Sequence, residues 1–166
     1  MKYFTRAWAD GTLPDGEWEA TGHTYRRRIE QIAGLLPEPL LTLARDISLH
    51  DALIRQVCAD LTSARLSLRL VCGDLQVGYF DLNLEYRGVD WRYVNRKVLA
   101  RRAEEEATEI LYDEVDCLPE GGYEHRILFW PEDEIVLRFR ALTLQRTERT
   151  DRDFTQAAEP YVEVSA

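Results

Sequence analysis

The sequence predicts an α+β domain in which two or three amino-terminal helices pack on one face of a meandering antiparallel sheet of about six strands. Three observations lead to this fold class. Apolar residues recur every three or four positions up to residue 36, and the period changes to two after His50. Short turns rich in glycine, proline and aspartate separate the alternating segments.

The amino-terminal quarter of the chain has a helical pattern. Asp15-Gly16 is a turn or cap signal, and the spacing that follows it predicts an amphipathic helix over residues 15–35. Prolines at 37 and 39 end that helix, and leucines at 40, 41 and 43 indicate a second, short one. A third helix is expected over residues 2–9. The residues that set the spacing of the long helix are Trp18, Gly22, Tyr25, Ile29, Ile32 and Leu36.

Alternation of apolar and polar residues predicts the strands. In the second of them, leucines at 66, 68 and 70 alternate with Arg65, Ser67 and Arg69, which is typical of a strand with one buried face. A turn around Gly73-Asp74 joins this strand to the next. The expected strands cover residues 51–60, 63–72, 78–86, 108–118, 123–130 and 134–144.

Residues 87–107 lie between the third and fourth strands and carry a weaker pattern. Asp90 is a candidate cap for a helix over this stretch, but its charges run against the helix macrodipole, with Arg92 and Arg96 near the start and Glu104 at the end. We therefore expect a mobile helix or a lid-like excursion. Residues 1–146 are expected to form one domain, and the non-periodic residues 147–166 a loosely ordered carboxy-terminal tail.

The net charge of −9 is unevenly distributed. Residues 104–134 hold twelve carboxylates and one cation, Arg126, which is a net −11 and leaves +2 for the rest of the chain. This field repels nucleic acid phosphates and anionic lipid and favours a basic protein partner. The alternative is a sheet face that charge keeps solvated. The candidate partner-binding residues are Trp91, Glu104, Glu105, Glu106, Glu109 and Asp113.

The composition predicts a cytoplasmic protein without a cofactor. The opening MKYFTRAWADG lacks the apolar region of a secretory signal, and no apolar run approaches the length of a membrane span. The cysteines at 58, 72 and 117 are odd in number and widely spaced, so we expect buried, reduced thiols. They do not have the paired spacing of a zinc site.

His50-Asp51 is the main candidate for chemistry. The order His23, His50-Asp51, Asp113 loosely matches helical metal phosphohydrolases, but those enzymes hold their ligands on packed helices, whereas Asp51 opens a strand here. A second interpretation joins His50, Asp51 and His125, with Glu124 or Glu114, in a strand-borne metal site. A third places His50-Asp51 at a helix-to-strand joint, where both side chains satisfy backbone groups.

Other reactive motifs are missing from the sequence. It contains no GxSxG elbow, no glycine-rich phosphate loop and no HExxH pair. The four tryptophans, at 8, 18, 91 and 130, suit core or interface packing better than a ligand cage, and Trp91 is the best candidate for a contact anchor.

Four blocks of sequence carry a resemblance: the opening MKYFTRAW, the joint LHDALI, and the later EILYDEV and YEHRILFWPEDEIVLRF. Together they resemble an uncharacterised bacterial family of unknown function whose members commonly begin MKYFT. The resemblance implies a bacterial protein and supplies no catalytic residues. The small size, the acidic charge and the expected hairpin sheet are also similar to those of immunity proteins that neutralise bacterial toxins.

These observations favour a protein that is not an enzyme and that binds a basic protein through its acidic surface. An immunity-type inhibitor of a basic toxin is the most concrete version. The alternative is a metal-dependent hydrolase that uses His50, Asp51 and His125. An exposed edge strand such as residues 134–144 offers a surface for pairing two copies as a homodimer.

Overall fold

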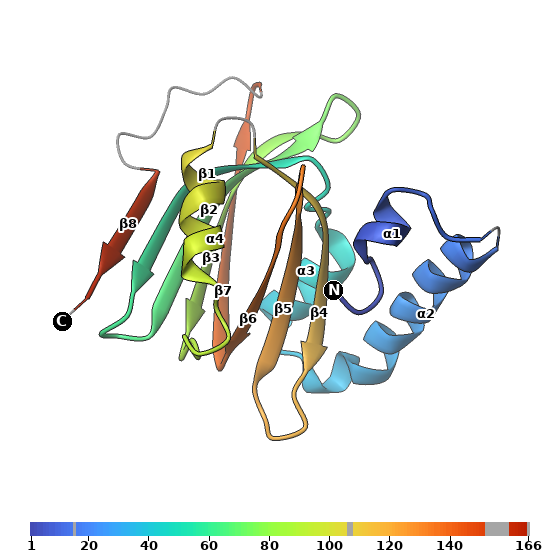
Figure 1. Ribbon diagram of the computed structural model, residues 1–166, viewed down its shortest axis with the longest axis horizontal. Helices are drawn as coiled ribbons and strands as arrows, with labels where there is room; N and C mark the ends of the chain where they lie inside the picture. Colours follow the sequence, from blue (N-terminus) through green and yellow to red (C-terminus); the bar gives the residue numbers. More distant parts are fainter. Residues whose placement is uncertain (15, 106–107, 152–159, 166) are drawn as a thin grey trace.

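The chain folds as an α+β protein with an antiparallel sheet, as the sequence predicts. A computed structural model describes every residue except 15, 106–107, 152–159 and 166. The described residues form four α-helices, one short 3₁₀ helix and eight strands (Figure 1). Both numbers exceed the expected two or three helices and about six strands.

Three helices precede the sheet. They are α1 (Arg6–Ala9), α2 (Glu17–Ile32) and α3 (Glu38–Asp46), and the 3₁₀ turn η1 (Ala33–Leu35) joins the last two. The side chain of Thr5 caps α1 by accepting a backbone N–H of its first turn. Within the described part of the chain, no helix combines the length and the apolar character that crossing a bilayer requires.

A fourth helix, α4 (Arg96–Glu104), occupies the stretch expected to be a mobile helix or a lid-like excursion. Its amino-terminal cap is Asn95 and not Asp90, so the helix starts later than expected. This start places Arg101 and Arg102 in the last turn, where cations interact favourably with the macrodipole. Arg96 and Lys97 still lie in the first turn and Glu104 at the end, so the unfavourable charge order expected from the sequence is only partly offset.

The strands follow the period-two segments of the sequence closely, and the region after His50 is sheet. Their order in the sheet is β6-β5-β4-β1-β2-β3-β7, with β8 paired to β1. The strands are β1 (Ala52–Asp60), β2 (Arg65–Asp74), β3 (Gly78–Arg87), β4 (Glu109–Cys117), β5 (Tyr123–Trp130), β6 (Glu134–Phe139), β7 (Ala141–Arg149) and β8 (Tyr161–Val164).

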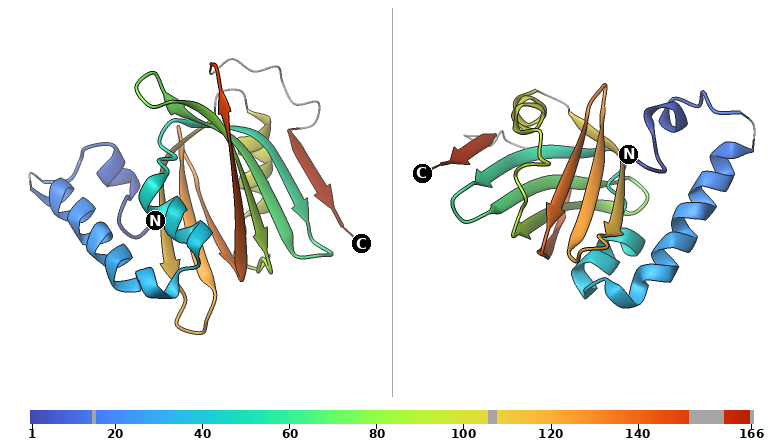
Figure 2. Two further views of the ribbon diagram at one scale, coloured as in Figure 1. Left: turned by 180° about the vertical axis from the view of Figure 1, so that it is seen from behind. Right: turned by 60° about the horizontal axis from the view of Figure 1, so that its bottom comes forward.

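A bend at Arg140 divides the predicted strand 134–144 and turns the meander into a curled sheet. β6 before the bend pairs with β5, whereas β7 after it pairs with β3, so one bent segment joins the two ends of the sheet (Figures 1 and 2). Glycine is required around this corner. A Cβ on Gly88 would lie 2.8 Å from Arg140 Cγ, and one on Gly122 would lie 2.8 Å from the Phe139 carbonyl oxygen.

The last part of the chain differs from the expected loosely ordered tail. β7 continues to Arg149, and β8 pairs in parallel with the second half of β1. The first half of β1 pairs instead with β4, through Ala52 and Leu53 only. Residues 152–159 lie outside the described part of the chain.

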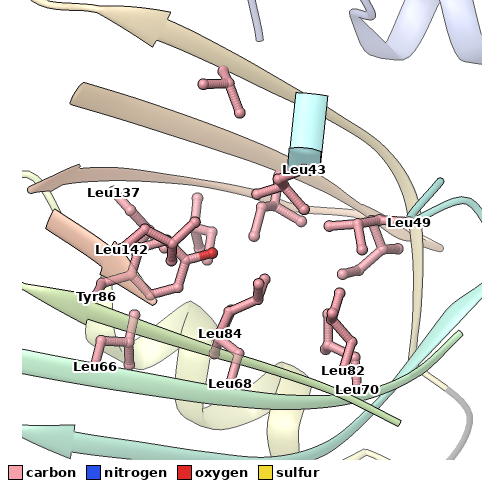
Figure 3. Close-up of a cluster of buried hydrophobic side chains, with 14 of the residues drawn as sticks. Leu43, Leu49, Leu66, Leu68, Leu70, Leu82, Leu84, Tyr86, Leu137 and Leu142 are labelled. Carbon is pink, nitrogen blue, oxygen red and sulfur yellow. The ribbon is translucent and has the colours of Figure 1, made fainter. Parts of the chain in front are cut away.

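The core lies inside the curled sheet. The inward side chains of β2 and β3 face those of β6 and β7, and Leu43 of α3 enters between them (Figure 3). Each fully buried leucine contributes about 1.5–3 kcal/mol relative to an exposed one. α3 contacts β4 and β7, which do not pair with each other, and α4 contacts β6 as well as the paired strands β1 and β8. α2 contacts β4 and its amino end leans away from the sheet (Figures 1 and 2).

Candidate functional site

His50 and Asp51 lie at the corner where the chain passes from α3 into β1. Asp51 adopts a left-handed conformation, with φ of 61°, and its N–H donates to the Ile110 carbonyl at 2.8 Å. His50 Nδ1 lies 3.0 Å from Asp51 Oδ1, and the imidazole meets the Tyr112 ring edge-on with 5.0 Å between centroids. About half of each side chain is exposed, 45% for His50 and 53% for Asp51. The pair therefore shapes a surface corner.

His125 lies in the core, in a chain of three polar side chains. The Tyr86 hydroxyl is 2.8 Å from His125 Nδ1, and His125 Nε2 is 3.0 Å from Asp113 Oδ2. A neutral imidazole satisfies both contacts, because the tyrosine O–H donates to Nδ1 while Nε2–H donates to the carboxylate. Burial, and then the charge of Asp113, raises the pKa of Tyr86 well above its usual range, so the phenol stays protonated.

The three predicted metal ligands do not form one cluster. His50 and Asp51 pair at the surface, whereas both ring nitrogens of His125 are occupied by Tyr86 and Asp113. Across the described ranges, no group of three or more histidine, cysteine, aspartate or glutamate side chains could hold a metal ion.

Glu114, in the acidic segment, is buried under the amino terminus and is not solvated. Its side chain is fully buried and accepts backbone N–H bonds from Lys2, Tyr3 and Phe4 at 2.6–3.1 Å. Arg126 donates to the same carboxylate at 3.0 Å. Successive N–H groups around a carboxylate form an anion-binding nest, so Glu114 fixes the path of the first four residues across the outer face of β4.

Two more carboxylates on this outer face are buried and paired. Glu124 contacts Arg126, two residues further along β5, and Arg138, which lies opposite it on β6. Asp116 accepts two bonds from Arg28 of α2, the shorter at 2.7 Å. Burial alone would raise the pKa of Asp116, but the hydrogen bonds from Arg28 and the Cys117 N–H, with nearby positive charge, outweigh burial and lower it.

The predicted partner-binding residues are scattered. Glu104 is exposed at the end of α4, and Glu105 pairs with buried Arg102 at 2.8 Å. Glu109 opens β4, Asp113 points into the core toward His125, and Glu106 lies outside the described residues. Trp91 is half-buried against the core. These residues therefore do not form one exposed acidic patch.

An aromatic groove lies between α2, α3 and β4, and sequence reasoning did not identify it. Its volume is about 770 Å³, and Trp18, at its edge, is 49% exposed. Trp18 stacks on buried Trp8 with centroids 4.9 Å apart, and the Trp8 Nε1–H donates to the Trp18 carbonyl at 3.0 Å. The lining residues are Phe4, Trp8, Trp18, Glu19, Gly22, His23, Tyr25, Arg26, Ile29, Glu30, Ala44, Arg45 and Tyr112.

A second cavity of about 370 Å³ adjoins the aromatic groove and shares Phe4, Tyr25 and Tyr112 with it. His50 and Asp113 line this second cavity. The His50 corner and one end of the buried polar chain therefore border the same concave region as the aromatic groove.

The rim of the aromatic groove carries unpaired charges of both signs. Most other arginines of the chain, such as Arg28 and Arg126, have a carboxylate within 3.0 Å. In contrast, Arg26 and Arg45 have no hydrogen-bond or ion-pair partner among the described residues, and the same holds for Glu19 and Glu30. Four charged side chains thus face one aromatic groove with their binding capacity unused.

The sequence contained a partial signal for the aromatic groove. The spacing of Trp18, Gly22, Tyr25 and Ile29 predicted an inward helix face, and that face does line the groove. However, only Ile29 and Ile32 of α2 are buried, because the helix leans away from β4 at its amino end. Helical periodicity gives the direction of a face but not its distance from the next element.

Comparison with known proteins gives no family for this chain. No protein-family model, curated protein or solved structure matches it.

Proposed function

We propose that this protein acts by binding a segment of another protein in the aromatic groove. The observation that carries the proposal is the combination of an aromatic lining, with Trp18 exposed at its edge, and four charged side chains that lack partners in the described part of the chain. Exposed tryptophan beside tyrosine and arginine is the composition of interaction hot spots. An apolar anchor residue would contact Trp18 and Tyr25, and charged neighbours would meet the rim.

The charge of the groove indicates the chemistry of the segment. Glu19 and Glu30 offset Arg26 and Arg45, so the groove is nearly neutral within a chain of net charge −9. A segment with charges of both signs around an aromatic or aliphatic anchor complements this rim. Binding of that kind should depend weakly on salt, because neither partner needs a large net charge.

An immunity-type inhibitor of a basic toxin is the second candidate, and the net charge of −9 favours it. The internal pairing of Glu114, Asp116 and Glu124 weakens it, since these carboxylates already have cation partners. Long-range attraction would remain, and it would make the affinity fall steeply as salt rises. Salt dependence therefore separates the two candidates.

The test is selection of groove ligands from a phage-displayed library of random peptides. We expect the selected peptides to share an aromatic or aliphatic anchor and to lose about 2 kcal/mol of affinity, roughly 30-fold, on Trp18→Ala. Trp130→Ala is the matched control, because Trp130 is similarly exposed, at 52%, lies on β5 and does not line the groove. Thermal unfolding of each variant verifies that the fold is retained.

Charge reversal sharpens the same test. Arg45→Glu should shift the selected peptides from acidic to basic residues beside the anchor, whereas Arg65→Glu, at an exposed site on β2, should not. Peptides that bind the Trp18→Ala variant as tightly as the wild type would contradict the proposal. Lysine- and arginine-rich peptides with a steep salt dependence would support the acidic-surface candidate instead.

A further inference from the structure

The edge of β1 is shared by two different strands. β4 pairs with this edge only at Ala52 and Leu53, and the β1–β2 ladder on the opposite edge has a register shift between Ile54 and Gln56. From Val57 onward, the same edge pairs with β8. Without β8, the edge of β1 from Val57 to Asp60 would expose unpaired backbone groups such as the Val57 N–H, and an exposed edge of this kind is the usual template for strand addition.

β8 is held in place by a short ladder with β1 and by a few side-chain contacts. Its ladder runs from Val57 opposite Tyr161 to Asp60 opposite Val164, and the Val57 N–H donates to the Pro160 carbonyl at 2.7 Å. None of the four residues of β8 is fully buried. The β1–β8 pair is also the only parallel pair of strands among the described residues.

One side-chain network fixes β8 against α4. Arg96 of α4 donates to Glu163 at 2.8 Å, and the Tyr161 hydroxyl donates to the same carboxylate at 2.8 Å. The Tyr161 ring packs against the core. The slot between β1 and α4 thus accepts an extended segment with an aromatic residue first and an acidic residue third.

None of these contacts requires that β8 belong to the same molecule. Residues 150–160 join it to β7, and eleven residues span up to roughly 38 Å. The segment known to fit the slot in every contact is Tyr161–Val164, and a second copy of the chain carries the same segment. Mutual exchange would give a closed two-fold dimer, because each slot is filled by the partner's strand.

We infer that the slot between β1 and α4 is a strand-addition site, and that two copies of the protein exchange their Tyr161–Val164 strands through it. The exchanged dimer carries twice the net charge of −9, so added salt favours it by screening the repulsion between copies. This dependence has the opposite sign to that of a basic partner on an acidic surface. The inference uses neither the aromatic groove nor its ligand.

Complementary charge reversal tests the exchange in the full chain. Arg96→Glu and Glu163→Arg each place like charges in the slot when β8 binds in the same molecule. Mixed together, the two variants restore opposite charges in both slots, but only if the strands exchange. We expect the mixture to show twice the 19.3 kDa mass of the single chain by light scattering, with one copy of each variant by native mass spectrometry.

Lys97→Glu is the matched control for Arg96→Glu. Lys97 is the neighbouring exposed cation on α4 and, among the described residues, forms no hydrogen bond or ion pair with β8, so its mixture with Glu163→Arg should not gain heterodimer. A mixture of Arg96→Glu and Glu163→Arg that stays at the single-chain mass, at high protein concentration and high salt, would overturn the inference.

A cross-link gives a second, independent readout. Cys58 lies opposite Val162 in the β1–β8 ladder, so oxidised Val162→Cys protein should link strand to slot. Exchange predicts covalent dimers on a non-reducing gel, in a fraction that rises with protein concentration. The Cys58→Ser/Val162→Cys protein measures direct linkage between the two introduced thiols. Links confined to single chains at every concentration would refute the exchange.

Discussion

The two outer faces of the curled sheet look alike in sequence and differ in the structure. On β3, the outward residues Asp81 and Glu85 are each about 37% exposed, and each pairs with an arginine at the surface. On β4 and β5, the outward residues Glu114 and Glu124 are almost completely buried beneath or beside the amino-terminal segment. All three strands carry charged residues on the side that faces away from the core.

The difference shows that the alternation of a strand identifies the side that faces away from the core and not what covers it. On the open face of β3, an arginine replaces water beside the carboxylate, and the free energy of folding changes little. On the covered face of β4, the carboxylate has lost its water, so removing one of its remaining partners strongly destabilises the fold. The comparison can be tested by removing matched carboxylates and ring contacts from the two faces.

Glu114→Gln should have the largest effect. The substitution removes the charge that three backbone N–H groups and Arg126 share, and it leaves Arg126 partly buried without its full counter-charge. We expect a loss of about 3–5 kcal/mol in the free energy of unfolding, measured in urea. Glu85→Gln on the open face should change it by less than about 0.5 kcal/mol. Equal effects of the two substitutions would remove the basis of the comparison.

Phe4→Ala should have the second-largest effect on stability. Phe4 belongs to the segment that covers the outer face of β4, and its ring lies 5.0 Å from Tyr25 and 4.8 Å from Trp8 between centroids. The ring is half-buried, so we expect the free energy of unfolding to fall by about 2 kcal/mol, roughly half the loss for a fully buried phenylalanine. Thermal unfolding measures this loss. Leu75→Ala, at a 91% exposed site in the β2–β3 turn, should leave the midpoint unchanged.

Asp116→Asn should cost about 1.5 kcal/mol at pH 7, because Asp116 is a buried acceptor bonded to Arg28. The folded-state pKa of Asp116 is lowered, so its contribution is present above the unfolded pKa of about 4 and is lost as pH falls through the folded value. Stability of the wild type should therefore fall more steeply below about pH 4 than that of the variant.

Asp81→Asn is the control on the open face, where Asp81 pairs with Arg149 at 2.8 Å. Its effect at pH 7 should stay below about 1 kcal/mol. Urea unfolding across a pH series measures both variants. Parallel pH curves for the wild type and Asp116→Asn would contradict the assignment of a lowered pKa to Asp116.

Acetylation of the amino terminus should have the smallest effect. The Met1 ammonium lies 2.7 Å from Glu134, whose side chain is 48% exposed. Exposed ion pairs contribute about 0–1 kcal/mol, so the acetylated and free chains should differ by no more than that in urea. A larger loss would mean that the ammonium, and not the nest around Glu114, holds the amino-terminal segment on β4.

Much of the fold could be predicted because it depends on local patterns. The expected strands 51–60, 78–86 and 123–130 match β1, β3 and β5 to within about a residue at each end. The helix expected over 15–35 matches α2 with η1. The bend at Arg140 was missed because a single residue that turns a strand leaves the period of two on either side intact.

The site was less accessible to sequence reasoning. His50, Asp51 and His125 stood out as reactive residue types, but histidine and aspartate serve equally well at a corner or in a buried polar chain. The aromatic groove depends on the angle between α2 and the sheet, and on how the amino-terminal segment covers β4. Neither is a local property of the chain.

The sequence by itself determined where helices and strands form and which side chains face the core, because backbone geometry fixes both periods within a few residues. Tertiary structure alone decided that β6 and β7 join the two ends of the sheet, that β8 fills the second half of the β1 edge, and that the carboxylates of β4 are covered while those of β3 are not. These outcomes depend on contacts between residues far apart in the sequence, as between Arg87 and Ala141 or between Lys2 and Glu114, which no local pattern records.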